Sequence, residues 1–233
     1  MELIEHSKIK YDNSIVIASL PDMGSVGGLV SNFFADNMEE TTHIATIISI
    51  EKPWVSYSKG KVELVSDEYK IYFSHKYNSI IFTGNTQPKE SSELYSLCHV
   101  LLKYLTSHGS VRIIYSAGGY LKQQTLTQSP AVCGVVNNDN LIPLLNDLSI
   151  DLVGSEISNI TWFNGLILGL ASKYGISGIG LFGEIAETDI AQPLAAKSIV
   201  RAICKLEKFF LDTRLLDENY ENILNEKYLK RER

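Results

Sequence analysis

The sequence predicts one α/β domain of three layers, in which helices cover both faces of a mostly parallel mixed sheet. Short apolar runs bounded by Gly, Pro or polar turn residues recur along the chain, as in strands buried on both faces. Segments with apolar residues at helical spacing alternate with these runs. The 233 residues contain no linker rich in Pro, Gly or Ser, so we expect a single domain spanning 1–233.

Residues 15–37 form the unit around which we expect the fold to be organised. An apolar run at 15–20 predicts a buried strand, 21–25 predicts a tight turn, and the segment after Gly27-Gly28 has helical spacing. Such a unit typically begins a parallel sheet, whose binding surface lies at the carboxyl ends of the strands. We therefore expect residues 21–28 on that surface.

The next segment changes the character of the sheet. Residues 44–50 predict a second buried strand, whereas 54–74 alternate between apolar and polar residues, with turn residues between the runs. This alternation predicts antiparallel strands and a β-hairpin excursion. A buried run at 79–83 follows, so the sheet should be mixed.

The rest of the chain alternates between helices and strands. Pro88 suits the first turn of a helix, and Gly109 suits its end. The polar stretch 121–130 predicts a long loop at the same edge as 21–28. The other expected elements are strands at 111–116, 132–136 and 177–182, a short helix ending near 145, and helices at 164–174, 193–210 and about 214–230.

Three glycine-rich segments, 24–28, 118–119 and 178–183, are expected as turns after strands. If they meet at the carboxyl edge, they form a backbone-lined rim able to hold an anion or a peptide. The first segment matches neither the dinucleotide-binding nor the P-loop fingerprint. Tight turns and close helix packing would explain the glycines without a ligand. Dinucleotide binding, with Glu51 on a ribose, is the weaker alternative. The candidate rim residues are Pro21, Asp22, Met23, Gly24, Gly27, Gly28, Gly118, Gly119, Gly183 and Glu184.

The sequence predicts no catalytic residue, metal or cofactor. Ser116 lacks the first glycine of a nucleophile elbow, and Cys98 and His99 point in different directions on one helix. The histidines and cysteines show no zinc-ligand spacing. An acidic group, Glu184, Glu187 and Asp189, could meet a metal or a basic partner, although a solvated loop is the simpler interpretation.

Composition limits the compartment and the partners. A formal charge of −6 disfavours nucleic-acid binding, which needs a clustered basic face. Three cysteines without a pairing pattern favour reduced thiols. No secretory signal and no membrane-spanning run is expected, so we predict a cytoplasmic protein.

Seven motifs in order resemble the proteasome assembly chaperone 2 family in its stand-alone archaeal form. The resemblance runs over nearly the whole chain, and it rests on the order and spacing of the motifs together. The motifs are Leu20-Pro-Asp-Met-Gly-Ser-Val-Gly27, Thr83-Gly-Asn-Thr-Gln-Pro88, Tyr115-Ser-Ala-Gly-Gly-Tyr120, Gly165-Leu-Ile-Leu168, Gly180-Leu-Phe-Gly-Glu184, Pro193-Leu-Ala-Ala-Lys197 and Leu211-Asp-Thr-Arg-Leu215.

The resemblance implies a fold like that of nucleoside phosphorylases and a homo-oligomer. It implies a non-enzymatic chaperone or assembly factor that binds proteasome subunits or other protein clients. The alternative is a phosphate- or nucleoside-binding enzyme of phosphorylase-like or ATP-grasp-like type, although the chain has no glycine-rich phosphate loop with a lysine. Members of the family that dock on proteasomes end in a hydrophobic-Tyr-X tail, whereas this chain ends in Arg231-Glu232-Arg233 with Tyr228 inside.

Overall fold

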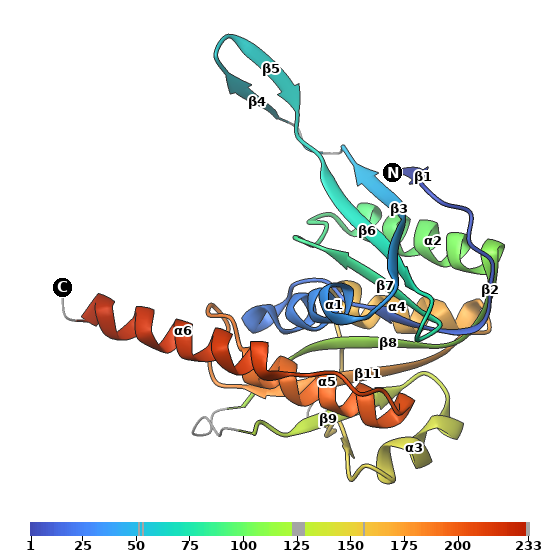
Figure 1. Ribbon diagram of the computed structural model, residues 1–233, viewed down its shortest axis with the longest axis vertical. Helices are drawn as coiled ribbons and strands as arrows, with labels where there is room; N and C mark the ends of the chain where they lie inside the picture. Colours follow the sequence, from blue (N-terminus) through green and yellow to red (C-terminus); the bar gives the residue numbers. More distant parts are fainter. Residues whose placement is uncertain (51, 53, 123–128, 156, 232–233) are drawn as a thin grey trace.

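The computed structural model contains a nine-stranded mixed sheet with helices on both faces, and it describes residues 1–50, 52, 54–122, 129–155 and 157–231 (Figure 1). The strand order is β1-β3-β6-β7-β2-β8-β11-β9-β10. The four central strands, β7, β2, β8 and β11, are parallel to one another. Strand β6 pairs antiparallel with β7, and β9 pairs antiparallel with β11. The strands are β1 (Glu2–Glu5), β2 (Tyr11–Ala18), β3 (Thr41–Ser49), β6 (Asp67–Ser74), β7 (Ser79–Gly84), β8 (Gly109–Leu121), β9 (Val132–Val136), β10 (Asp151–Leu152) and β11 (Ser177–Ile185).

The helices form two layers, one on each face of the sheet (Figure 1). Helices α2 (Ser91–His108) and α4 (Trp162–Lys173) pack in one apolar core, and α1 (Val26–Asn37) and α5 (Pro193–Glu207) pack in the other. Strand β2 serves both cores, because successive strand side chains point to opposite faces. Its Val16 and Ala18 belong to the first core and its Ile15 and Ile17 to the second. The prediction of a three-layer α/β domain is confirmed.

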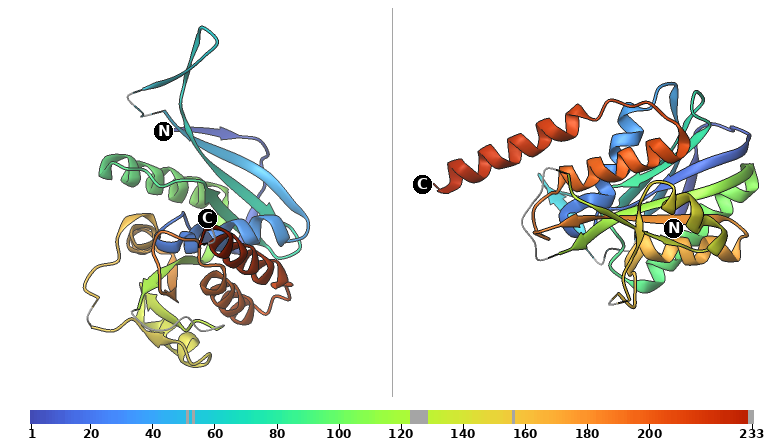
Figure 2. Two further views of the ribbon diagram at one scale, coloured as in Figure 1. Left: turned by 90° about the vertical axis from the view of Figure 1, so that its left-hand side faces the viewer. Right: turned by 90° about the horizontal axis from the view of Figure 1, so that it is seen from below.

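A β-hairpin formed by β4 (Val55–Ser58) and β5 (Lys61–Leu64) makes a separate two-stranded sheet. Figures 1 and 2 show it standing clear of the main sheet. Val55 pairs with Leu64 and Tyr57 with Val62, so these four side chains share one face of the hairpin. The predicted hairpin excursion is therefore present, and its apolar residues lie together.

The C-terminal helix α6 (Arg214–Arg231) begins against the body and then leaves it. Leu216 is fully buried in the core that α5 shares, whereas Tyr220 is half-buried. Beyond this point the helix extends past the rest of the molecule, as two views agree (Figures 1 and 2). Three short helical segments complete the fold: η1 (Met23–Ser25), η2 (Asp139–Leu141) and α3 (Ile142–Asn146).

Several expected boundaries are wrong. Helix α2 begins at Ser91 rather than at Pro88, because Glu90 has extended backbone angles. The Gly118–Gly119 segment is not a turn, since it lies within β8. The strand expected at 177–182 is confirmed as β11, which continues through Gly183 and pairs with β8 in parallel register. Helix α5 ends at Glu207, where Lys208 adopts a left-handed conformation. Strands β1 and β10 were not expected from the sequence.

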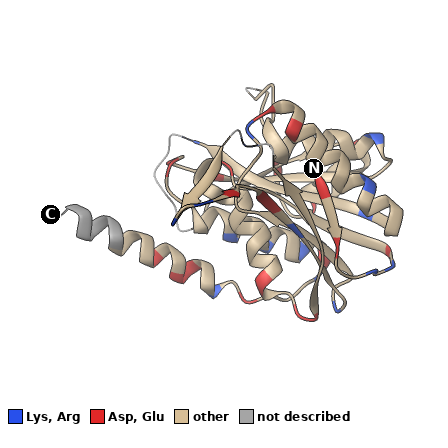
Figure 3. Ribbon diagram, turned by 90° about the horizontal axis from the view of Figure 1, so that it is seen from above, with Lys and Arg blue, Asp and Glu red and all other residues tan. Residues whose placement is uncertain are grey.

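Part of the predicted loop at 121–130, residues 123–128, and the ribose candidate Glu51 lie outside the described residues. Within the described part of the chain, no helix is both long and apolar enough to cross a membrane. Basic and acidic segments are interspersed in the view from above rather than gathered by sign (Figure 3).

Candidate functional site

The turn after β2 places the Asp22 carboxylate between the first turn of α1 and strand β8. Its Oδ1 accepts a hydrogen bond from the Gly27 backbone N–H at 2.8 Å, and its Oδ2 accepts one from the Gly119 N–H at 2.6 Å. A Cβ atom at Gly118 would lie 2.7 Å from Oδ2, so this position needs glycine. The structure therefore brings Asp22, Gly27, Gly118 and Gly119 together at the carboxyl edge.

Burial dominates the protonation of Asp22. Removal from water disfavours the charged form and raises the pKa of this carboxyl to about 6, although the N–H groups of Gly27 and Gly119 oppose the rise. Among the described residues, no Lys, Arg or His side chain lies within 4.0 Å of it to form an ion pair. At neutral pH the site thus holds a largely buried negative charge stabilised by backbone dipoles alone.

The other residues of the first turn connect it to the loop after β11. Gly24 has a φ of 62°, its N–H donates to the Thr188 carbonyl at 2.7 Å, and its carbonyl accepts from the Gln192 N–H at 2.8 Å. Gly28 packs against the Pro21 ring, where a Cβ would lie 2.8 Å from Cγ. Met23 is exposed. This turn is therefore held by the loop after β11 at Gly24 and by packing on Pro21 at Gly28.

Gly183 and Glu184 lie on β11 beside the rim but take no part in the Asp22 cluster. A Cβ at Gly183 would meet the Ala195 carbonyl at 2.9 Å, so this glycine serves the packing of α5. The Glu184 carboxylate forms an ion pair with Lys122. The rim expected from the sequence thus divides into the cluster that contacts Asp22 and the end of the neighbouring strand β11, which pairs with β8 but does not contact Asp22 by hydrogen bonds.

Two amide side chains that the sequence reasoning did not select hold the cluster in place. Asn164 on α4 accepts from the Leu20 N–H at 2.9 Å and donates to the Leu20 carbonyl at 3.0 Å, as a neighbouring strand would. Gln87 donates to the Pro21 carbonyl at 2.6 Å and accepts from the Phe163 N–H at 3.0 Å. Gln87 follows β7 at the carboxyl edge, which was the available sequence indication.

A cavity of about 540 Å³ opens beside this cluster, and Asp22 is part of its wall. Most of the wall is apolar and comes from loops at the carboxyl edge of the sheet. Trp162 begins α4 with a φ of 60°, a left-handed conformation that is rare for a bulky residue. The apolar lining includes Met23, Pro88, Ile157, Ile160, Trp162 and Phe182.

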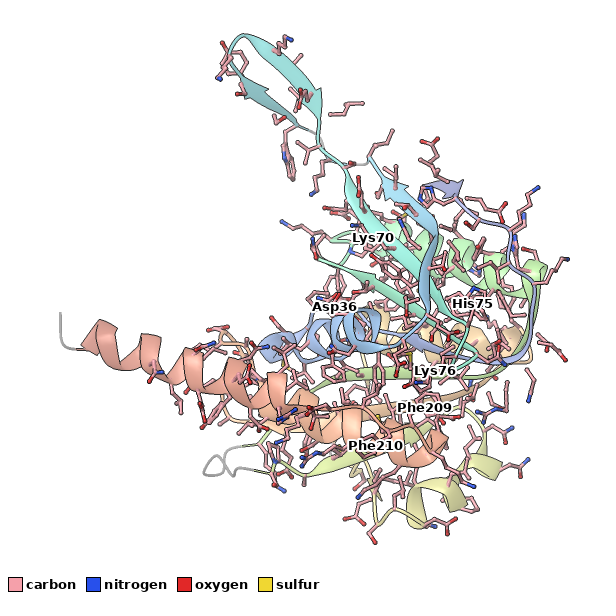
Figure 4. All side chains as sticks on the ribbon, in the orientation of Figure 1. Asp36, Lys70, His75, Lys76, Phe209 and Phe210 are labelled. Atoms are coloured by element: carbon pink, nitrogen blue, oxygen red, sulfur yellow. The ribbon has the colours of Figure 1, made fainter. Side chains whose placement is uncertain are left out.

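A second hollow, of about 350 Å³, lies on the other side of the central strands and is polar. Asp36 of α1 and Lys70 of β6 are among its lining residues, and Figure 4 shows where they lie. Thr83, Gly84, Asn85 and Thr86 of the Thr83–Pro88 motif also line this hollow, although the sequence did not indicate a cavity there.

The nucleophile candidates are not available for catalysis. The Ser116 hydroxyl is fully buried and has no hydrogen-bond partner among the described residues. Burial raises the pKa of the Cys98 thiol to about 12, which keeps it protonated. No three His, Cys, Asp or Glu side chains of the described residues come together in a way that could hold a metal ion.

Known proteins with a similar sequence profile or a similar structure match this chain over most of its length. The sequence profile of the PAC2 family matches residues 16–229. Pyrococcus furiosus PbaB, described as an archaeal proteasome activator, is 25% identical, with 99% of this chain and 97% of that chain aligned and a TM-score of 0.82. PbaA of the same organism, described as an archaeal homolog of proteasome-assembly chaperone, is 20% identical over 99% and 92% of the two chains, with a TM-score of 0.79.

A proteasome-assembly chaperone homologue of Mycobacterium tuberculosis has the same fold, with 15% identity over 92% and 94% of the two chains and a TM-score of 0.72. No curated protein matches the sequence significantly. Because the family profile spans most of the chain and the structural likeness extends from end to end, the chain belongs to the PAC2 family.

Proposed function

We propose that this protein is a non-enzymatic, homo-oligomeric chaperone or assembly factor that binds proteasome subunits or other protein clients. Its likeness to PbaB and PbaA, whose descriptions name the proteasome and its assembly, supports this role. The observation that carries the proposal is the projecting hairpin β4–β5, because its shape and surface suit contact with another protein.

One face of the hairpin is apolar and open to solvent. Tyr57, Leu64 and Val62 are 74%, 70% and 67% exposed, and Val55 beside them is also exposed. The opposite face carries Ser and charged residues. An isolated two-stranded hairpin is at best marginally stable in water. A partner that covers this face would remove the exposed apolar surface and stabilise the hairpin.

The C-terminal region supplies a second protruding surface. Phe210 lies on the connection between α5 and α6 (Figure 4) and is 94% exposed, whereas its neighbour Phe209 packs on Tyr77 with ring centroids 4.9 Å apart. Helix α6 then extends away from the domain. We propose that these elements contact other copies of the chain in a homo-oligomer. The free thiols at Cys98 and Cys204 support a reducing, cytoplasmic setting.

The alternative is a small-molecule enzyme that binds phosphate or a nucleoside at the glycine-rich rim. The backbone N–H groups of Gly27 and Gly119, which would be the natural donors to a phosphate, already donate to Asp22. A phosphate would have to displace this carboxylate and would meet its charge. The arrangement therefore favours the protein-binding proposal.

The experiment that tests the proposal compares the two faces of the hairpin. We expect the double variant Tyr57→Ser with Leu64→Ser to capture proteasome α subunits about tenfold less well than the unchanged protein, because apolar anchors dominate interface energies. The measurement is binding of purified subunits to immobilised protein over a concentration series.

The matched control changes the polar face of the same hairpin, with Ser56→Ala and Glu63→Ala. This variant should bind like the unchanged protein, and both variants should keep the thermal unfolding temperature because the hairpin lies outside the main sheet. Equal loss in both variants, or no loss in either, would contradict a role for the apolar face.

A further inference from the structure

The cavity beside Asp22 combines a mainly apolar wall with one partly buried carboxylate among the described residues. Trp162, Phe182 and Ile160 are among its apolar lining residues, and its volume of about 540 Å³ is that of a pocket for a sizeable ligand. Asp22 lies at the meeting point of the first turn and β8, where its position is fixed by two backbone hydrogen bonds. Among the described lining residues Asp22 is the one carboxylate, in a mainly hydrophobic surrounding that also includes Lys89 and several amide and hydroxyl side chains.

The carboxylate has capacity for another donor. Each of its oxygens accepts one backbone N–H, whereas an ionised carboxylate has about four acceptor positions. None of the described cationic side chains forms an ion pair with it. Lys89 also lines the cavity, but its side chain is exposed and does not pair with Asp22. Even a partly buried charge without a counter-charge is costly, so a cation that enters the cavity gains from the contact.

Part of the cavity wall is held in position by side-chain hydrogen bonds. Gln87 links the Pro21 carbonyl to the first N–H of α4 after Trp162, and Trp162 itself keeps a left-handed backbone conformation. Strain of this kind persists only when surrounding contacts maintain it, and it clusters at binding sites. The indole ring thus lines a cavity whose geometry is set before any ligand arrives.

We propose that this cavity binds a lysine or arginine side chain of a protein partner, with the cationic group on Asp22 and the aliphatic stem along the apolar wall. Long basic side chains bury their methylene groups against apolar surface, and a tryptophan ring attracts cations. The volume exceeds the needs of one such side chain, so an apolar neighbour in the partner segment fits as well. The proposal rests on the protein-binding function, and it assigns that function a specific contact.

The test uses short blocked peptides and the fluorescence of Trp162. The chain has two tryptophans, so Trp54→Phe, directly before strand β4 of the hairpin, leaves Trp162 as the only one. A titration followed by this fluorescence should give acetyl-Leu-Arg-Leu-amide a dissociation constant at least about tenfold lower than that of acetyl-Leu-Gln-Leu-amide. The reason is that a hydrogen bond to a charged group is strong. Butylamine, which carries the cation without a peptide, should bind more weakly than the arginine peptide.

Three variants in the same background identify the contact. Asp22→Asn should weaken the arginine peptide about tenfold and leave the glutamine peptide unchanged. Met23→Lys keeps Asp22 but adds a positive charge at the exposed rim, so it should weaken the arginine peptide about threefold, and Lys89→Gln should strengthen it by a similar factor. Glu63→Gln, on the hairpin, removes an equal charge far from the cavity and should have no effect.

The proposal would be overturned by equal binding of the two peptides, by equal binding of butylamine and the arginine peptide, by no response to Met23→Lys, or by no fluorescence change at millimolar peptide. These outcomes are separate from the failure of the proposed function. Capture of proteasome subunits that persists in Asp22→Asn but disappears in the apolar-face hairpin variant would reject the cavity and keep the chaperone role.

Discussion

The burial of Asp22 makes the stability of this protein depend on pH in a defined direction. The native carboxyl has a pKa of about 6, against 3.8 for an unperturbed Asp. Between these values the native state holds a proton that the unfolded state has released. The free energy of unfolding therefore falls as pH rises through this window, and the full effect is present only above the native pKa.

The magnitude follows from the difference between the two pKa values. One pKa unit corresponds to 1.36 kcal/mol, so the ionisation of Asp22 lowers the free energy of unfolding by about 3 kcal/mol in total. About 2 kcal/mol of this change falls between pH 4 and pH 7. The cause is the cost of keeping a charge in a site from which water is largely excluded, only partly offset by the N–H groups of Gly27 and Gly119.

The assay is urea unfolding at half-unit pH intervals, for the unchanged protein and for Asp22→Asn. Subtraction of the two profiles removes the contribution of all other titrating groups. The difference should decline by about 2 kcal/mol from pH 4 to pH 7. Glu63→Gln, on the exposed hairpin, should give a flat difference. A flat difference for Asp22→Asn, or one that rises with pH, would refute the account of a desolvated carboxylate.

Four further variants test the packing and the surface of the site. Gly118→Ala should lower the free energy of unfolding, measured in urea, by about 1–3 kcal/mol, because its Cβ would press on Asp22. Gly169→Ala, in open space on α4, should raise the same quantity by up to about 1 kcal/mol. Asn164→Ala should lower the free energy of unfolding by about 3 kcal/mol, because it leaves two buried backbone groups of Leu20 unpaired. A loss smaller than about 1 kcal/mol would argue against this contact. Glu184→Lys should reduce capture of protein partners while changing stability by less than about 1 kcal/mol, and unchanged capture would remove β11 from the binding surface.

The parts of the fold that the sequence predicted are those whose burial repeats at a local period. Residues 15–18 of β2 form an uninterrupted apolar run because both faces of the strand are covered there, and the hairpin alternates because only one of its faces is apolar. Strand β1 escaped detection because all four of its residues are exposed and two are glutamates. Gly118 and Gly119 resemble a turn locally, and only their pairing with β11 places them in a strand, whereas the strand at 177–182 was predicted despite its glycines.

The candidate site was predictable only as a location. The position of residues 21–28 after a strand placed Asp22 at the carboxyl edge, but the Gly119 N–H that fixes its orientation is 97 residues away. Asn164 contacts Leu20 across 144 residues, and Gln87 contacts Pro21 across 66. Such contacts leave no periodic trace in the sequence, so the two amides and the cavity they support emerged only from the structure.

Native mass spectrometry tests the central claim most directly. The purified chain would be measured alone and then mixed with the proteasome α and β subunits of its own organism. The protein-binding account predicts a homo-oligomer that forms a defined complex with these subunits and loses it when the apolar face of the hairpin is changed. A chain that ignores every subunit yet retains phosphate or a nucleoside would contradict the account.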